Sequence, residues 1–110
     1  MKKETTNKAV VFYNNKKAGI LSKREDIFEF EYSSDYINNP DSKPVSKTMP
    51  LSQKNFFSER LFPFFENLLP EGTLLEMTIA KLKIDKNNKF RLLLHVGEDT
   101  VGAITVKPLE

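Results

Sequence analysis

His95 is the one histidine of the chain, and the sequence contains no cysteine that could share a metal ion or act as a nucleophile beside it. A metal site would need carboxylates as its other ligands, and a nucleophile–base pair would need a second reactive group. The sequence places His95 in the last turn of a predicted helix, where the helix dipole favours a histidine. We therefore expect His95 to be a helix-end residue, and we expect no metal and no catalytic residue.

Two further patterns resemble reactive sites but lack essential parts. Glu66 and Glu71 could form an acid/base pair. However, Glu66 lies off the apolar stripe of its predicted helix and Glu71 stands in a Pro-Glu-Gly turn, so we expect both to be solvated. Gly97 and Gly102 bracket a short loop, but no Lys-Ser/Thr pair follows and a strand, not a helix, comes next. Without any kinase signature, the sequence predicts neither an enzyme nor a cofactor.

The aromatic side chains are the remaining candidates for function. Most of the nine phenylalanines fall at core positions, but Phe56, Phe57 and Phe62 do not. They could staple the start of a helix to the core. Alternatively, at least one could anchor a partner protein, because aromatic residues dominate the energetics of interfaces. We place Phe62 beside Glu66 and outside the core as the first choice, and Phe57 as the alternative if Pro63 shifts the helix start.

The residue pattern in the first third of the chain predicts an antiparallel meander of β-strands. Residues 9–13 and 18–21 are rich in aliphatic and aromatic residues, and Asn14-Asn15 between them suits a tight hairpin turn. Residues 27–32 alternate, so that Phe28, Phe30 and Tyr32 share one face and two glutamates share the other. Residues 33–51 contain three prolines and predict a long loop with at most a short turn and an extended piece.

Helical spacing begins after Ser58. Leu61, Phe64, Phe65, Leu68 and Leu69 form one apolar stripe with Leu68 at its centre, and Pro63 fits the first turn. The inward face of a second helix is predicted to consist of Leu75, Thr78, Ile79 and Leu82. A third helix is predicted from the N-cap Asn88 to Gly97, with Phe90, Leu93 and Leu94 turned inward.

These elements predict an α+β fold in which a small antiparallel sheet, made of the N-terminal meander and a C-terminal strand at 102–106, packs with about three helices. With 110 residues, the chain has room for a single domain over 1–110, and we expect residues 1–8 to be flexible.

Composition and charge limit the classes of function. No apolar run reaches the roughly 20 residues that cross a membrane, and no signal peptide is evident, so we expect a cytoplasmic protein without a membrane partner. Residues 1–24 carry seven Lys/Arg and one acid, whereas residues 25–41 carry six acids and no base. The net charge of +2 favours a lysine-rich hairpin beside an acidic strand over a nucleic-acid-binding surface.

Four segments of the chain resemble the N-terminal subdomain of HipA-type toxin kinases. The most specific are Phe-Phe-Glu-Asn-Leu-Leu-Pro-Glu-Gly at 64–72 and Gly-Glu-Asp-Thr-Val-Gly-Ala at 97–103. Residues 13–21 look like the family's first hairpin, and residues 44–51 look like its Pro-Leu-Ser-x-x-Leu-Pro-Leu segment. Among small proteins, the chain most resembles the HipS family of the three-gene HipB–HipS–HipT toxin–antitoxin systems.

The resemblance implies a non-catalytic function, because this subdomain buttresses the ATP-binding lobe in the family. It implies an antitoxin that binds and inhibits a HipT-like Ser/Thr kinase, with a HipB-like DNA-binding protein as a further partner in a ternary complex. Two alternatives stay open: an accessory subdomain that completes or activates the kinase, and, more weakly, a nucleic-acid-binding module. The chain departs from the family pattern at Lys47, where an apolar residue is usual, and at Tyr36, near a position that is often Trp. Because the chain has no Trp, a Phe or Tyr would have to make any inhibitory contact.

Overall fold

The structure is a computed structural model that describes residues 7–100 and 102–109. One sheet forms the centre of the fold, and all four of its strand pairings are antiparallel. Its strand order is β4-β3-β2-β1-β5. The strands are β1 (Lys8–Tyr13), β2 (Lys16–Arg24), β3 (Ile27–Tyr32), β4 (Asn55–Ser58) and β5 (Ile104–Pro108). The predicted α+β class is confirmed.

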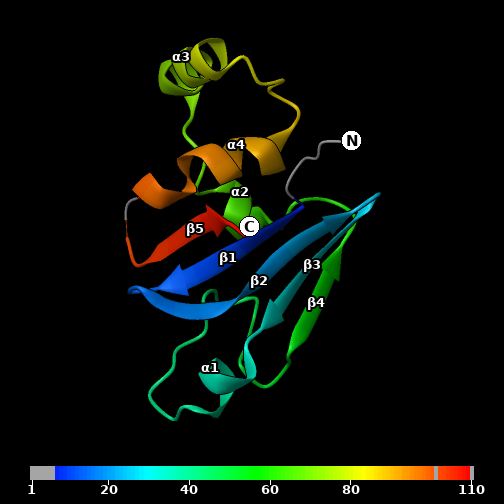
Figure 1. The fold of residues 1–110 in the computed structure, drawn as a ribbon, viewed down its shortest axis with the longest axis vertical. Coiled ribbons are helices and arrows are strands. Elements are labelled where there is room, and N and C mark those ends of the chain that lie inside the picture. The colour runs from blue at the N-terminus through cyan, green and yellow to red at the C-terminus, as the bar shows by residue number, and fades with distance from the viewer. Residues whose placement is uncertain (1–6, 101, 110) are drawn as a thin grey trace.

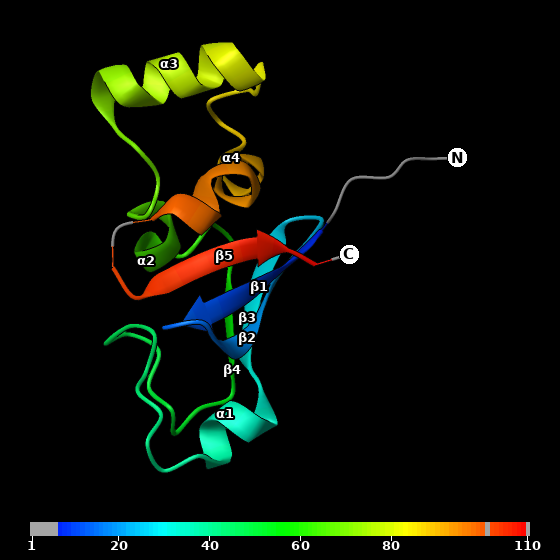
Figure 2. The same cartoon turned by 60° about the vertical axis from the view of Figure 1, so that its left-hand side comes forward.

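Helices lie on one face of the sheet and at its two ends (Figures 1 and 2). The helices are α1 (Ser34–Asn38), α2 (Pro63–Glu66), α3 (Gly72–Leu82), α4 (Lys89–Val96) and the 3-10 turn η1 (Gly97–Asp99). Helices α2 and α4 cover one face, α1 lies at the lower end in Figure 1, and α3 stands apart at the upper end. Of the residues expected to be flexible, residues 1–6 lie outside the described residues, whereas Lys8 is part of the sheet as the first residue of β1.

The predicted meander is confirmed in detail. Asn14 and Asn15 form the hairpin turn with φ angles of 48° and 69°, the left-handed conformation that such turns require. On β3, Phe28, Phe30 and Tyr32 are all buried, and the two glutamates between them lie on the other face. The alternation in the sequence therefore identified the inner face of the sheet correctly.

The region between the meander and α2 differs from the prediction. The loop contains the short helix α1, and it is followed by an edge strand, β4, that the sequence did not indicate. Strand β4 pairs with β3 in the register Phe30↔Phe56 and Glu29↔Phe57. Its four residues are too few for alternation to stand out from a polar neighbourhood, and the pairing partner lies more than 20 positions away.

Helix α2 is shorter than the apolar stripe predicted. It ends at Glu66, and Leu68 and Leu69 lie in the turns beyond it, where both are half-buried. The expectation that Phe62 lies outside the core is also wrong, because its side chain is only 8% exposed and packs edge-on against Phe65. Phe62 caps the helix in an extended conformation, with φ −56° and ψ 136°, so helical spacing does not set its direction.

The other two predicted helices exist, but they differ in burial. Asn88 caps α4 as predicted, accepting a hydrogen bond from the Arg91 N–H, and Phe90 and Leu93 are buried. Leu92 is buried as well, whereas Leu94 is half-buried. No residue of α3 is buried, and the four residues predicted to face inward are only half-buried.

We expect Phe65→Ala to destabilise the domain far more than Leu68→Ala. Phe65 is fully buried and contacts the rings of Phe30, Phe62 and Phe64. Truncation of a buried Phe costs about 3–5 kcal/mol, and the half-buried Leu68 should cost less. Urea denaturation of the two variants checks the difference, and equal losses would show that the centre of the core lies elsewhere.

Gly97 allows η1 to approach β5 closely. A Cβ atom at this position would lie 2.6 Å from the Val106 carbonyl oxygen and 2.8 Å from the Val106 Cβ. Its φ is −65°, so the glycine is needed for space rather than for the left-handed conformation expected at a helix end. The strand backbone on one side and the helix end on the other leave no room for a methyl group.

We therefore expect Gly97→Ala to lower the free energy of unfolding by about 1–3 kcal/mol. Gly72→Ala is the matched control, because nothing lies within 4 Å of a Cβ there and only its φ of 59° opposes the substitution, at about 1 kcal/mol. Thermal melts of both variants check this. A Gly97→Ala protein as stable as the wild type would mean that β5 moves away at little cost.

Candidate partner-binding site

The sequence singled out three aromatic residues, and all three lie in the lining of one hollow in the surface. It has a volume of about 510 Å³ and lies between the long loop, β4 and the start of α2. Phe56 and Phe62 form its floor and are each 8% exposed, whereas the Phe57 side chain is 65% exposed. The remaining lining residues are Ser46, Thr48, Met49, Gln53, Pro63, Phe64 and Asn67. The structure thus brings the three candidates together, but it leaves only Phe57 free to contact another protein.

Strand β4 explains why neighbouring phenylalanines differ so strongly. Successive side chains of a strand point to opposite faces, so Phe56 enters the core and Phe57 does not. The Phe56 ring packs against Phe30 and Tyr32, with ring centroids 6.4 and 6.0 Å away. Phe57 is instead paired across the strands with Glu29, and its side chain points to the face opposite that of Phe56. An exposed phenylalanine on an edge strand is a candidate anchor for a partner.

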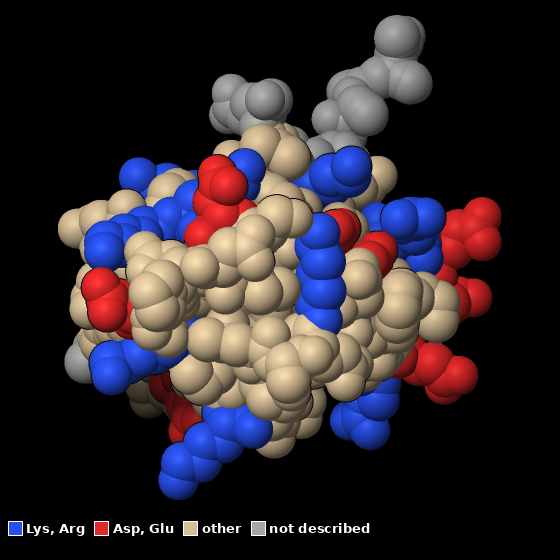
Figure 3. All heavy atoms as spheres, turned by 90° about the horizontal axis from the view of Figure 1, so that it is seen from below, with Lys and Arg blue, Asp and Glu red and all other residues tan. Residues whose placement is uncertain are grey.

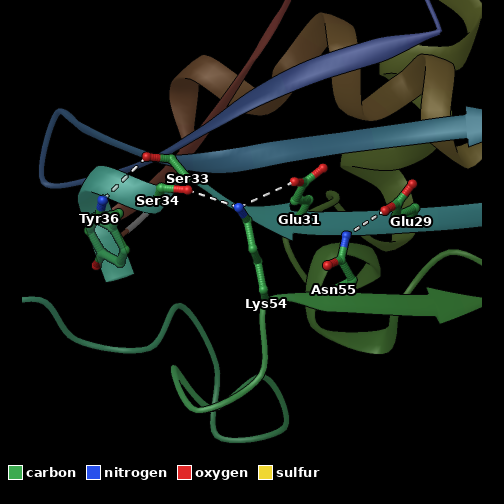
Figure 4. Close-up of polar contacts among 7 residues, drawn as sticks. All are labelled: Glu29, Glu31, Ser33, Ser34, Tyr36, Lys54 and Asn55. Atoms are coloured by element: carbon green, nitrogen blue, oxygen red, sulfur yellow. Dashed lines mark hydrogen bonds and ion pairs between the residues drawn. The ribbon is translucent and has the colours of Figure 1, made fainter. Parts of the chain in front are cut away.

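Polar contacts hold β4 and its approach in place (Figure 4). The Asn55 amide donates to the Glu29 carboxylate over 2.8 Å, and the Lys54 ammonium donates to the Ser34 hydroxyl over 2.8 Å. Lys54 also lies 3.8 Å from the Glu31 carboxylate. Exposed ion pairs of this kind contribute at most about 1 kcal/mol. The role of these polar contacts is to fix the register between β3 and β4, and this register sets the direction in which Phe57 points.

Two buried tyrosines hold the loop that forms the other wall. The Tyr32 hydroxyl donates to the Met49 carbonyl and accepts from the Val45 N–H, while the Tyr36 hydroxyl donates to the Lys43 carbonyl. The Tyr32 and Tyr36 rings stack with centroids 5.9 Å apart. Burial raises the pKa of both phenols above the usual value of about 10. The loop is therefore attached to the core by hydrogen bonds, and the two that the hydroxyls donate require neutral phenols.

We expect Tyr32→Phe to destabilise the protein and loosen the loop. The substitution removes both hydrogen bonds and leaves a buried N–H and a buried carbonyl unpaired, at a cost of about 1–3 kcal/mol. Tyr13→Phe is the control, because Tyr13 is only half-buried. Chemical denaturation at pH 7 compares the two. Equal stability of the two variants would argue against the tyrosine-held loop.

The raised pKa values also predict a dependence of stability on pH. Below about pH 10, both phenols are neutral in the folded and the unfolded states. Above it, the unfolded phenols ionise first, which favours unfolding, so stability falls as the pH rises towards the higher pKa values of the folded state. Denaturation between pH 8 and about 11 should show a smaller fall for Tyr32→Phe than for the wild type, and parallel curves would contradict this.

The sequence did not identify the other apolar walls of the hollow. Met49 is 2% exposed and belongs to the loop, whereas Pro63 and Phe64 start α2. The unusual length of the loop and the resemblance of residues 44–51 to a family segment were the signals that pointed to the loop. The end of the molecule where α1 and the loop lie presents mainly uncharged atoms, with acidic and basic side chains interspersed around them (Figure 3). The charges seen there do not form the basic patch that a nucleic-acid-binding surface needs.

The remaining candidates occupy solvated positions. His95 is exposed in the last turn of α4, as predicted. Glu66 forms an ion pair with Lys89, and Glu71 is exposed at the start of α3. Within residues 7–100 and 102–109, no group of three or more His, Cys, Asp or Glu side chains could hold a metal ion. None of the described helices is long and apolar enough to cross a membrane.

A second hollow, beside the start of α4, has a mixed lining. Its volume is about 500 Å³, and it contains the basic residues Lys23, Arg60 and Lys89 together with the acidic residues Glu66 and Asp85. Because side chains of both charges line it and Lys89 is paired with Glu66, it does not form a site for a single class of charged ligand.

Comparisons with known proteins match nearly the whole chain. The family model described as HipA N-terminal domain matches residues 9–107. A solved structure described as the N-terminal domain of HipA toxin has a TM-score of 0.71 and 32% identity, and covers 99% of this chain and 98% of its own. An uncharacterised protein of Haemophilus influenzae is 35% identical over 97 residues, which are 88% of each chain.

Two longer relatives contain the same domain as a part. The Serine/threonine-protein kinase toxin HipA of Shewanella oneidensis is 36% identical over 83 residues, which are 76% of this chain but 18% of that protein. A HipA chain from this organism, solved in a complex with HipB and its operator DNA, has a TM-score of 0.68 and 29% identity over 91% of this chain and 23% of its own. The chain thus spans about a fifth of these longer relatives.

Proposed function

Because the chain belongs to the HipA N-terminal domain family, we propose that it acts as a non-catalytic antitoxin that binds and inhibits a HipT-like Ser/Thr kinase. The family is linked to toxin–antitoxin systems through its toxin members. Within it, the N-terminal domain is a non-catalytic part of the kinases. A domain that accompanies a kinase in longer relatives is suited to bind such a kinase when it is encoded separately.

The exposed Phe57 is the observation that carries this proposal. It rises beside an apolar hollow of about 510 Å³ on an edge strand whose position is fixed by polar contacts. An aromatic anchor next to an apolar depression has the composition of an interface centre. Inhibition would follow if Phe57 entered the kinase's nucleotide cleft or held its nucleotide lobe in an inactive position.

The main alternative is a domain that completes or activates the kinase, and it uses the same surface. The two differ in the sign of the effect, so kinase activity must be measured with and without the chain. A HipB-like protein is a further proposed partner, because the related HipA chain was solved together with HipB and operator DNA. We propose that this chain itself does not contact nucleic acid and acts in the cytoplasm.

We expect Phe57→Ala to weaken kinase binding without affecting folding. Loss of an aromatic anchor commonly costs roughly 2 kcal/mol or more, which is about thirtyfold in affinity. The probe is the HipA-family kinase that co-purifies with the tagged chain, identified by mass spectrometry and re-expressed for calorimetry. Phe62→Ala serves as the contrast, because Phe62 is buried and its loss should lower the melting temperature first.

Three results would decide against the proposal. The first is that the wild-type chain binds no HipA-family kinase. The second is that Phe57→Ala binds as tightly as the wild type, which would place the contact elsewhere. The third is a rise in kinase activity on addition of the chain, which would favour the activating alternative. Labelled ATP provides a separate check, because we expect the isolated chain neither to transfer phosphate nor to bind ATP at micromolar concentrations.

A further inference from the structure

Helix α3 has the composition of a core helix but contributes nothing to the core. Its eleven residues include Leu74, Leu75, Met77, Ile79 and Leu82, yet none is buried, and the Leu74 and Met77 side chains are 62% and 63% exposed. Isolated helices of this length are marginal in water, and most helical stability comes from packing of an apolar face. Helix α3 therefore presents an apolar face that needs a covering surface.

A groove separates α3 from the body of the domain. Its volume is about 540 Å³, and its exposed lining is mostly apolar. The lining residues are Asn67, Leu68, Leu69, Pro70, Leu74, Thr78, Val96, Asp99 and Thr100. Pro70 and the left-handed Gly72 hold the first end of α3 away from α4, and the left-handed Lys83 turns the chain at the other end. Figure 2 shows α3 beyond α4, on the side remote from α1.

The groove continues from the hollow beside Phe57. Asn67 lines both depressions, with Phe64 on one side of it and Leu68 on the other. The two depressions therefore adjoin at Asn67, just beyond the end of α2. A single partner seated over Phe57 would reach the groove past Asn67, which has the apolar Phe64 in one depression and the apolar Leu68 in the other.

We propose that α3 and this groove are a second contact for the same HipA-family kinase, which inserts an apolar segment between α3 and the body of the domain. The inference rests on the proposed function. Because no residue of α3 is buried within the domain, its apolar side chains are available to a partner, and the shared lining residue Asn67 favours the partner that covers Phe57 as the occupant. Met77 suits this role, because its flexible side chain adapts to an irregular partner surface.

A second copy of the chain is a poorer occupant. Eleven helical residues form a rod only about 16 Å long and about 10 Å wide. Two such rods packed together bury much less than the roughly 1,200 Å² of a stable interface. A kinase that spans both depressions covers a larger area, and in the long relatives about four-fifths of the chain lies outside this domain.

The test compares two double variants of α3. Leu74→Ser with Met77→Ser removes the exposed apolar side chains, whereas Glu76→Ser with Lys81→Ser removes exposed polar ones from the same helix. Both pairs introduce two serines, so the change in helix propensity is similar. Calorimetry with the co-purifying kinase should show an affinity loss of about tenfold or more for the first variant and less than about threefold for the second.

Hydrogen exchange provides a second measurement that needs no variant. The α3 amides should exchange quickly in the free chain and at least about tenfold more slowly in the kinase complex. If both double variants bind equally tightly, or α3 exchange is unchanged in the complex, while Phe57→Ala still weakens binding, this inference is overturned and the proposed function stands. If the wild-type chain binds no HipA-family kinase, both fail. A dimer of the isolated chain that is lost only with Leu74→Ser and Met77→Ser would assign the face to a second copy.

Discussion

The inner face of β3 is the constraint on which the rest of the fold depends. Three aromatic residues alternate along it, and each contacts a different part of the chain. Phe28 lies 5.9 Å from the Phe90 ring of α4, Phe30 lies 5.7 Å from the Phe65 ring of α2, and Tyr32 holds the long loop by hydrogen bonds. One strand thus positions the helical layer, the start of α2 and the loop relative to one another. The hollow beside Phe57 exists because the start of α2 and the long loop meet there.

Sequence patterns predicted the elements whose signals are local. The alternation over 27–32, the Asn-Asn turn and the Asn88 cap each depend on residues within a few positions, and all are present. The extent of α2 and the existence of β4 depend on tertiary contacts instead. An apolar stripe marks burial, but it does not distinguish a helix from a turn that buries the same residues. Leu68 and Leu69 continue the spacing of a helix that has already ended.

Only part of the candidate site could be predicted, because the direction of its side chains also depends on tertiary contacts. Phe56, Phe57 and Phe62 do line one depression, but the sequence favoured Phe62 as the exposed residue, whereas the structure exposes Phe57. Phe62 precedes Pro63, and its extended backbone turns the ring towards Phe65 instead of along the helix phase. The exposure of Phe57 follows from its pairing with Glu29, a contact that no local pattern contains. Gly97 was likewise predicted as a helix-end residue, whereas the structure requires a glycine there because the Val106 backbone lies too close for a side chain.

The position of β5 has a consequence for how this domain is inherited. The last strand lies beside the first, and the Leu109 N–H still donates to the Lys8 carbonyl beyond their paired residues. The two ends of the segment 8–109 therefore lie side by side, and all four strand pairings of the described residues are made within this segment. A gene fission or fusion at this boundary breaks no hydrogen-bonded ladder. The same sheet can therefore form a small part of a long chain, as in the HipA toxin of Shewanella oneidensis, or most of a short one, as in the Haemophilus influenzae protein.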